Sequence, residues 1–255
     1  MKKVFLVPVL LSLAIIAVIG SVELKAINGD NGTSGSSTAF FGQNYFPLSP
    51  GNQTYQLVGT CYRYYNNVQK EFEAINREEK IVVASAQKKY SKNVFPFMYI
   101  KHDGRTKKIG IDGNTIVGLA FDPSKVIAVS DDDPWKPAII LPAIFKVGST
   151  WIVNPEDNHS CVGKVSLSCV KHFSTFTNKR GRKYSDVIVI SGKTSFTKRR
   201  KPQIYKMSCY VYLAKGIGIV EATIDDSYNL SFNRISGTKN GTSEKANFTI
   251  SRKDK

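Results

Sequence analysis

Histidine is scarce in this chain of 255 residues, and the few that occur lie in no catalytic pattern. The three histidines are His102, His159 and His172. No G-x-S-x-G sequence is present to place a nucleophilic serine beside one of them. A dinucleotide-binding turn needs three glycines in the pattern G-x-G-x-x-G. Gly216 and Gly218 supply the first two, but Glu221 occupies the third position, so the pattern is incomplete. Residues 131–133 are acidic but lack the alternating ligands and the distal Glu of a calcium-binding loop. The sequence therefore predicts a protein that is not an enzyme, with no catalytic residue, no cofactor and no metal site.

The N-terminal 26 residues have the layout of an export signal. Lys2 and Lys3 precede an apolar run over residues 4–22, and a short positive segment before an apolar core directs a chain across a membrane. The run is longer than the core of most cleaved signals and close to the length of a spanning helix. Residues 1–26 are therefore either a signal peptide or an N-terminal membrane anchor. We expect the protein to be exported to the periplasm or the cell surface, and to meet the membrane only through this segment.

Cysteine is also sparse, and no C-x-x-C pair occurs. The four cysteines are Cys61, Cys161, Cys169 and Cys209. An even number of cysteines outside the cytosol predicts disulfides or buried thiols, and the pairing stays open. Together with His159 and His172, two of these cysteines have the residue types of a zinc site. Structural zinc sites, however, use the closely spaced cysteine pairs that this chain lacks.

Acidic residues are few beside basic ones, with 20 Asp and Glu against 36 Lys and Arg and a net charge of +16. The excess is largest in residues 179–201, which hold nine basic residues and one acid, Asp186. Such a region attracts polyanions. The predicted export excludes nucleic acid, which leaves anionic envelope polymers or a membrane surface as partners. The residues predicted to bind a polyanion are Lys179, Arg180, Arg182, Lys183, Lys198, Arg199, Arg200 and Lys201.

The body of the chain is predicted to be mainly β. Residues 27–44 begin with a Gly, Ser, Thr and Asn tract and form a flexible linker. Residues 45–235 form the β domain, and residues 236–255 form a polar basic tail or a last edge strand. Short strands without regular strand–helix alternation favour antiparallel topology. Residues 67–80 place three apolar side chains at helical spacing, so this segment is either one helix or a twisted strand. The predicted strands span residues 56–65, 81–86, 94–101, 108–111, 115–121, 126–130, 151–154, 162–174, 186–191, 203–213, 218–224 and 228–235.

Three short motifs follow one another along this domain. They read YFPLSPGNQTY at residues 45–55, ILPAIFKVGSTW at residues 140–151 and YVYLAKGIGIV at residues 210–220. In the first two, Pro ends a segment, Gly turns the chain and the aromatic residue that follows starts a strand. We interpret the glycines at positions 216 and 218 as marks of a bulge or a bend in a curved sheet.

These motifs resemble a poorly characterised group of bacterial exported proteins and lipoproteins with a YFPL…G…W start and a YAKGIGLV close. Thr54 stands where that group usually has Trp, and no cysteine follows the apolar run to carry a lipid anchor. The resemblance implies a single curved antiparallel sheet, a half-barrel or open barrel, similar to the periplasmic lipoprotein carriers. Some of those proteins hold a lipid or another apolar ligand in the concave face.

Two non-catalytic functions follow as hypotheses, with a hydrolase ranked last. In the first, the curved sheet binds an apolar or amphiphilic ligand, and Trp151, Tyr210 and Tyr212 lie near it because they belong to the motif strands. The same three aromatic residues would serve equally well as ordinary core. In the second, the basic region of residues 179–201 docks onto an anionic envelope component or a membrane surface.

Overall fold

The computed structural model describes residues 38–65, 68–100, 106–107, 109–111, 114–130, 138–153, 166–197, 203–230 and 242–253. Within these ranges the protein is mainly β, as predicted, and its helix is the four-residue α2 (Gly42–Tyr45). The strands of the first half are β1 (Phe40–Phe41), β2 (Gly51–Tyr65), β3 (Val68–Val83), β4 (Gln87–Lys89), β5 (Lys92–Ile100), β6 (Thr106–Lys107), β7 (Ile109–Ile111), β8 (Asn114–Asp122) and β9 (Lys125–Ser130). Those of the second half are β10 (Ala138–Leu141), β11 (Ile144–Phe145), β12 (Thr150–Ile152), β13 (Ser166–Thr177), β14 (Lys183–Thr197), β15 (Gln203–Ala214), β16 (Gly218–Leu230) and β17 (Thr242–Arg252).

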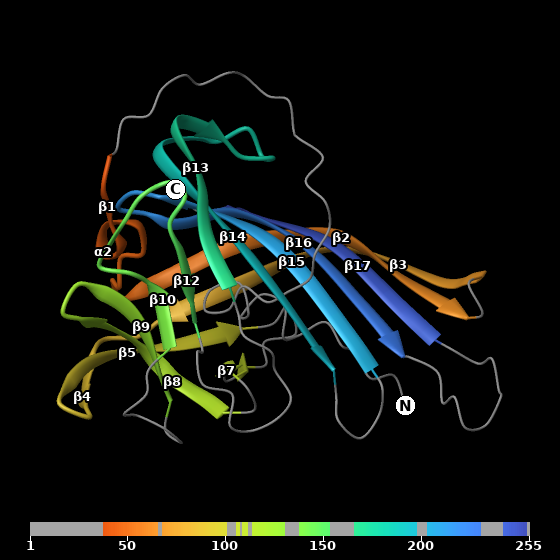
Figure 1. Ribbon diagram of the computed structural model, residues 1–255, viewed down its shortest axis with the longest axis horizontal. Helices are drawn as coiled ribbons and strands as arrows, with labels where there is room; N and C mark the ends of the chain where they lie inside the picture. Colours follow the sequence, from red (N-terminus) through yellow and green to blue (C-terminus); the bar gives the residue numbers. More distant parts are fainter. Residues whose placement is uncertain are drawn as a thin grey trace.

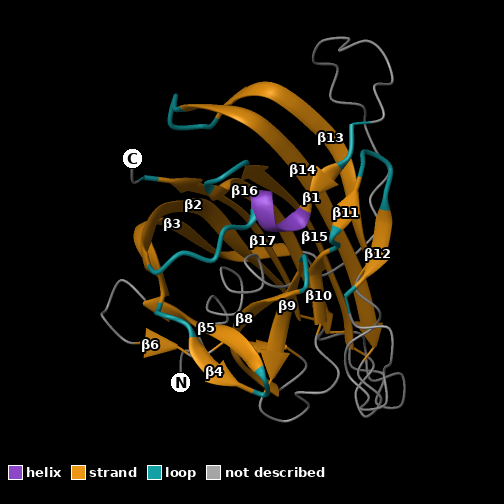
Figure 2. Cartoon of the chain, turned by 90° about the vertical axis from the view of Figure 1, so that its left-hand side faces the viewer, coloured by secondary structure: helices purple, strands orange, loops and turns teal. Residues whose placement is uncertain are grey.

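One large antiparallel sheet contains almost all of these strands. Its order is β10-β9-β8-β5-β3-β2-β17-β16-β15-β14-β13-β12, with β4 and β6 paired to β5 and β7 paired to β8. The long strands β2, β3 and β14 to β17 run side by side, and the short strands gather at one end (Figure 1). The sheet curls around α2 (Figure 2), and its first and last strands do not pair with each other. The predicted curved antiparallel sheet is therefore confirmed, in its open form.

Of the segment at residues 67–80, residues 68–80 form a strand and not a helix. It lies in β3, which pairs with β2 from Val68 opposite Tyr65 to Val83 opposite Gly51. Helical spacing of three apolar residues is a weak preference, and cross-strand pairing along a 16-residue strand overrides it. The hairpin expected around residues 112–114 is present, because Ile111 and Asn114 are paired at the ends of β7 and β8.

The domain also extends beyond both predicted boundaries. Residues 40–44, assigned to the linker by composition, form β1 and most of α2, and Phe40 is buried. Residues 242–252 are neither a tail nor an edge strand, since β17 pairs with β2 on one side and with β16 on the other.

The glycines of the third motif form a turn instead of a bulge within a strand. Residues 215–217 connect β15 to β16, and Gly216 and Gly218 have φ angles of 72° and 90°. Glycine adopts this left-handed region without the steric cost that other residues meet. The register shift expected of a curved sheet lies just beyond, where Leu213 pairs with Ile219 while Tyr212 pairs with Glu221.

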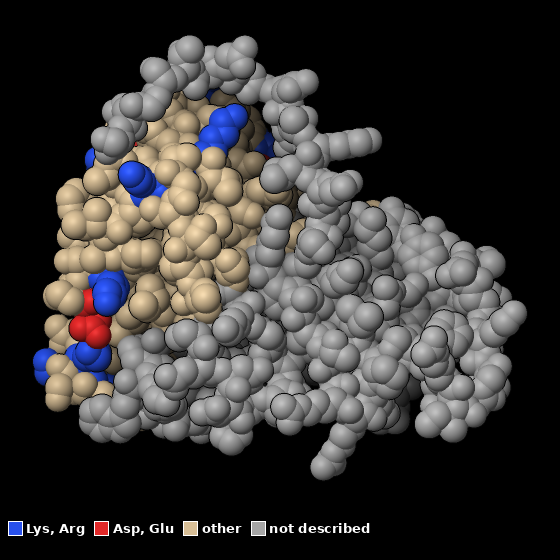
Figure 3. Space-filling model, viewed as in Figure 1, with Lys and Arg blue, Asp and Glu red and all other residues tan. Residues whose placement is uncertain are grey.

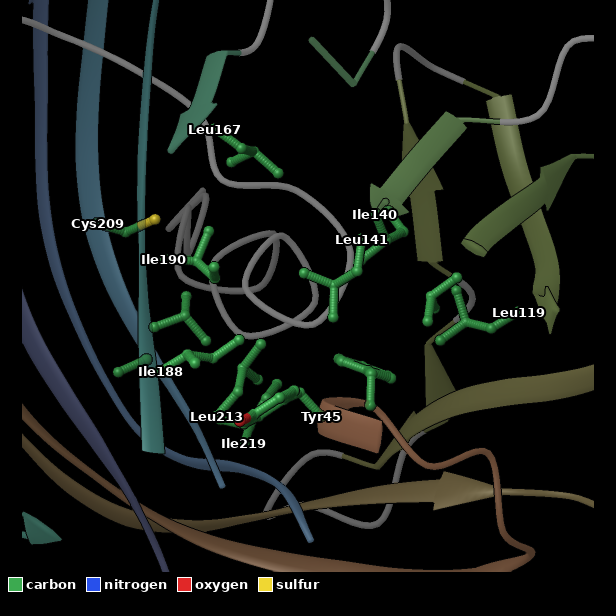
Figure 4. Packing of buried hydrophobic residues seen from close by; sticks show 14 of the residues in the cluster. Tyr45, Leu119, Ile140, Leu141, Leu167, Ile188, Ile190, Cys209, Leu213 and Ile219 are labelled. Atoms are coloured by element: carbon green, nitrogen blue, oxygen red, sulfur yellow. The ribbon is translucent and has the colours of Figure 1, made fainter. Parts of the chain in front are cut away.

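The main core fills the concave face of the sheet. It draws side chains from strands around the whole curve, among them Leu57 of β2, Leu119 of β8 and Ile188 of β14. Side chains of β14 and β15 point toward Leu141 of β10, on the opposite side of the curve (Figure 4). The curl thus lets one sheet cover its own apolar face, as two stacked layers do in a sandwich.

One short stretch of chain supplies both edges of the sheet. β10 and β12 are the terminal strands of the order, and Pro142 and Gly148, which has a φ of 91°, lie between them. The indole Nε1 of Trp151 in β12 donates a hydrogen bond to the carbonyl oxygen of Ile140 in β10 at 3.3 Å. We call this contact between the two edges the seam.

A second, smaller core lies on the convex face. The hairpin of β13 and β14 arches over this face (Figure 2), and Asn178 at its tip donates from Nδ2 to the carbonyl oxygen of Val220 at 3.4 Å. The hairpin and the sheet together enclose apolar residues beneath the arch. The members of this cluster are Val187, Ala214, Val220, Phe173, Phe176, Tyr184 and Tyr212.

Candidate functional site

Residues 40–48, which we call the terminal segment, lie in the concave mouth of the curved sheet. Phe40, Tyr45, Phe46 and Leu48 are buried and belong to the main core. Backbone bonds hold the segment at two points: Gly42 N donates to Ala143 O at 3.2 Å, and Gly216 N donates to Asn44 O at 2.6 Å. The fit at Gly42 is close, because a Cβ there would lie 2.4 Å from the carbonyl oxygen of Pro142. The terminal segment therefore covers part of the apolar concave face, and its strand β1 pairs with β11 in a separate two-stranded sheet.

Asp186 fastens the terminal segment to the sheet. Its Oδ1 accepts a hydrogen bond from the Tyr45 hydroxyl at 2.6 Å and lies 2.9 Å from His172 Nε2, and its Oδ2 lies 3.2 Å from Lys215 Nζ. Burial raises the pKa of Asp186, but the bonds from these three partners outweigh it and lower the pKa below its ordinary value. Burial and the bond to Asp186 raise the pKa of Tyr45. The carboxylate and the phenol therefore keep the ionisation states that their hydrogen bond needs.

The backbone of Asp186 is also unusual. Its φ is +52°, a region that residues other than glycine rarely adopt. The residue lies near the start of β14, and its carbonyl oxygen accepts a bond from Lys215 N at 3.0 Å. The turn after β15 and the side chain of Tyr45 are thus attached to one residue, which stabilises a conformation that would otherwise cost free energy.

Aromatic rings continue the contact between the terminal segment and the sheet. The ring of Phe40 lies 5.1 Å from that of His172, 5.6 Å from that of Tyr45 and 5.8 Å from that of Phe145, between centroids. Phe145 in turn lies 5.7 Å from Trp151, whose indole bridges the seam. The terminal segment and the seam therefore share one cluster of aromatic rings, so a change in the packing of either alters the contacts of the other.

The structure does not bring the three predicted ligand-binding aromatics together. Trp151 packs against the main core on the concave side. Tyr210 and Tyr212 alternate with the core residues Val211 and Leu213 along β15, so they lie on the convex side. Tyr212 stacks on Phe176 with centroids 4.5 Å apart, within the smaller core. Of the three, Trp151 is the residue that adjoins the concave face.

The predicted polyanion-binding region is divided by a strand. Lys179, Arg180 and Arg182 lie in the hairpin tip and Lys183 begins β14, whereas Lys198 to Lys201 follow the end of that strand and lie outside the described residues. The structure therefore places four of the eight predicted residues, all at one end of β14.

The hairpin tip is attached to the convex face through a buried carboxyl group. Glu221 is 4 % exposed, and its Oε2 accepts hydrogen bonds from Lys179 N at 2.6 Å and from Ser251 Oγ at 3.4 Å. Burial raises the pKa of Glu221, and these two bonds oppose that shift only in part. The side-chain oxygen Oδ1 of Asn178 accepts hydrogen bonds from the backbone N–H groups of Arg180 and Arg182, at 3.0 Å each. The turn is therefore rigid and fixed to the sheet.

Two of the four cysteines are buried free thiols, which fits one of the two predicted states. Cys169 and Cys209 both point into the concave core, and burial raises the pKa of each thiol to about 12. The side chain of Cys61 and the whole of Cys161 lie outside the described part, as do His102, His159 and residues 131–133. Among the described residues no group of three His, Cys, Asp or Glu side chains is placed to hold a metal ion.

The residues that attach the terminal segment gave no signal in the sequence. Tyr45 opens the first motif and Asp186 is the single acid of the basic region, but neither position indicates that the two side chains meet across 141 residues. A search of protein-family models and of curated proteins finds no match to this chain. In the described ranges, no helix has the length and the apolar character needed to span a membrane.

Proposed function

We propose that this exported protein is a non-catalytic carrier that binds an apolar or amphiphilic ligand against the concave face, where the terminal segment lies. The observation that carries the proposal is the nature of that cover. A short terminal stretch contributes Phe40, Tyr45, Phe46 and Leu48 to an apolar surface built by strands from both halves of the sheet. An acyl chain presents the same kind of surface as these side chains, and preformed apolar concavities with a few polar groups are typical ligand sites.

The polar groups at this mouth suit the head of an amphiphile. His172, Lys215 and Asp186 lie beside Tyr45, and each is partly exposed. When the terminal segment leaves, Asp186 loses the bond from Tyr45 while His172 and Lys215 stay on the sheet and its turn. A ligand with a hydrogen-bonding head and an apolar tail would then replace both sets of contacts.

The experiment fixes the terminal segment in place with a reversible bond. Phe41 and Ile144 are both exposed and directly opposite each other in β1 and β11. Opposite residues of antiparallel strands have Cα atoms about 4.5–5.5 Å apart, within disulfide range. The variant is F41C/I144C in a C61S/C161S background, so that the remaining native thiols are the buried Cys169 and Cys209. A matched control, V58C/N76C, places a disulfide between opposite exposed residues of β2 and β3 on the convex face.

Binding of a dansyl-labelled fatty acid to the delipidated protein is the measurement. We expect oxidised F41C/I144C to lose at least about tenfold in affinity, because the ligand must displace the fixed segment, and to regain it on reduction. The oxidised control should bind as the unmodified chain does. Equal binding by both oxidised variants, or no binding by any form, would refute the proposal. Native mass spectrometry of protein from its own envelope then identifies the ligand.

A further inference from the structure

The hairpin of β13 and β14 has a part within the sheet and a free part. β14 pairs with β15 from Val187 onward, and its earlier residues pair with β13. We call residues 171–186 the arm, which arches over the convex face (Figure 2). Both of its strands are irregular where it leaves the sheet: the register of β13 shifts between Cys169 and Lys171, and Asp186 of β14 has a φ of +52°. A bulge and a left-handed residue each bend a strand, so we place the bend of the arm at these residues.

The tip of the arm is attached to the convex face by hydrogen bonds. Lys179 N donates to the buried carboxyl group of Glu221 at 2.6 Å. The side chain of Asn178, which is also buried, donates from Nδ2 to the carbonyl oxygen of Val220 at 3.4 Å. The arm is therefore a strap that is fixed to the sheet at its tip as well as at its base.

The two sides of the arm differ in character. On the underside, Phe176 stacks on Tyr212 of the sheet with centroids 4.5 Å apart. On the outer side, Lys179, Arg180 and Lys183 are exposed. Figure 3 shows Lys and Arg side chains at the end of the molecule where Figure 1 places this hairpin. The tip is thus accessible from outside, while apolar contacts and hydrogen bonds hold it against the sheet.

The base of the arm is also the place where the terminal segment is attached. Asp186 of β14 accepts the hydrogen bond from the Tyr45 hydroxyl at 2.6 Å. The ring of His172, in β13, lies 5.1 Å from the ring of Phe40 between centroids. Each strand of the arm therefore contributes one contact to the terminal segment, and both contacts lie beside the bend.

The bend and the bond to Tyr45 depend on one backbone conformation. A residue with a side chain keeps a positive φ only where its surroundings hold it. Here the attached tip holds the arm in its bent course, and the Asp186 carbonyl oxygen accepts a bond from Lys215 N at 3.0 Å. Once the tip is released, Asp186 can relax to the extended conformation of a strand. That change points its carboxylate in another direction and breaks the bond to Tyr45.

We infer that the arm is a conformational switch for the terminal segment, so that release of its tip on the convex face loosens residues 40–48 on the concave face. The two faces are then coupled through Asp186 alone, and no movement of the sheet itself is needed. The purpose of the switch rests on the proposed function, because loosening the terminal segment opens the place that the ligand takes. The coupling itself can be measured without any ligand.

The test frees the arm by two separate substitutions, each made in the full chain. F176A removes the stacked ring beneath the arm, and N178A removes the bond from the tip to the sheet. V94A is the matched control, because Val94 is buried in a separate cluster formed by β5, β8 and β9. Amide hydrogen exchange is measured in the arm and at residues 40–48.

We expect F176A and N178A to raise exchange in the arm, and to raise it at residues 40–48 by at least about fivefold, the lower end of typical coupling between sites. V94A should leave exchange at residues 40–48 unchanged. Faster exchange in the arm with no change at residues 40–48 would overturn the inference, as would an equal rise in V94A. Unchanged exchange of the arm in both variants would overturn it too, since the arm would then not open apart from the sheet.

Two crossed measurements test the route through Asp186. In a Y45F background the bond to Asp186 is already absent, so F176A should raise exchange at residues 40–48 by less than about twofold. Because coupling between sites is reciprocal, Y45F alone should raise exchange in the arm. A full effect of F176A in the Y45F background, or an arm that does not respond to Y45F, would exclude this route. Failure here leaves the carrier proposal to its own binding experiment, and absence of ligand binding leaves the measured coupling intact.

Discussion

Replacing Tyr45 by Phe should loosen the terminal segment while the sheet stays folded. The substitution removes one hydroxyl group and keeps the buried ring, so the change is confined to the bond with Asp186 at 2.6 Å. A hydrogen bond to a charged group contributes roughly 1.5–3 kcal/mol. Asp186 is about one-third exposed and keeps His172 and Lys215, so we expect about 1 kcal/mol, which makes opening of the segment about fivefold more frequent.

Amide hydrogen exchange of residues 40–48 is the assay for this effect. Tyr55→Phe is the matched control, because the Tyr55 hydroxyl is bonded to Gln53 Oε1 at 2.7 Å and to the Ile219 carbonyl at 3.3 Å, within the sheet. It should lower the unfolding temperature without a local increase in exchange. An unchanged exchange rate in Tyr45→Phe, or the same local increase in Tyr55→Phe, would refute the role of Asp186.

The effect should also depend on pH in a definite direction. Because the pKa of Asp186 is lowered in the folded protein, its contribution to stability is present above the ordinary value of 3.8 and is lost as the pH falls through the lowered value. The difference in exchange between Tyr45→Phe and the unmodified chain should therefore shrink in acid. A difference that persists below the lowered pKa would show that the Tyr45 hydroxyl stabilises the segment without the charged carboxylate.

Three further substitutions test other parts of the structure. Glu221→Gln keeps the acceptor for Lys179 N but removes a carboxyl group whose pKa burial raises. The unmodified chain should lose stability as the pH rises above about 4.5, and the variant should keep it. Identical pH profiles of urea unfolding for the two proteins would contradict this. Gly118→Ala should destabilise the fold by about 1–3 kcal/mol, because a Cβ there would lie 2.3 Å from the Phe95 carbonyl oxygen; an unchanged unfolding temperature would show that the two strands separate easily. Trp151→Phe removes the bond across the seam, at a cost of about 1 kcal/mol, and exchange at residues 138–141 should rise.

The sequence predicts the antiparallel strands well, because strand signals are local, whereas the curvature of the sheet is what the family resemblance implies. The apolar and β-branched residues of β14 and β15, and the turn residues between strands, indicate these elements without reference to the rest of the chain. At β3 the local signal is ambiguous, since Val68, Phe72 and Ile75 have helical spacing. The partner strand β2 resolves it, and a pairing partner is information that a segment does not contain.

The candidate site is predicted less well, because it depends on which face a strand presents. Trp151, Tyr210 and Tyr212 were grouped because each belongs to a motif, but alternation along β15 sends the two tyrosines to the convex side. Of the predicted basic region, the structure places Lys179, Arg180, Arg182 and Lys183 at one end of β14, and the basic residues that follow this strand lie outside the described part of the chain. Tyr45 and Asp186 meet only because the sheet curls, and no pattern at either residue specifies that curl.

The place of β17 determines when the molecule can be completed. Strands β2 to β10 form one half of the sheet and strands β12 to β16 form the other, and the backbone pairing between the two halves runs through β17, which lies between β2 and β16. Until residues 242–252 are available, both halves expose an unpaired strand, a condition that promotes association between chains. The sheet is therefore completed only after residues 242–252 have been synthesised.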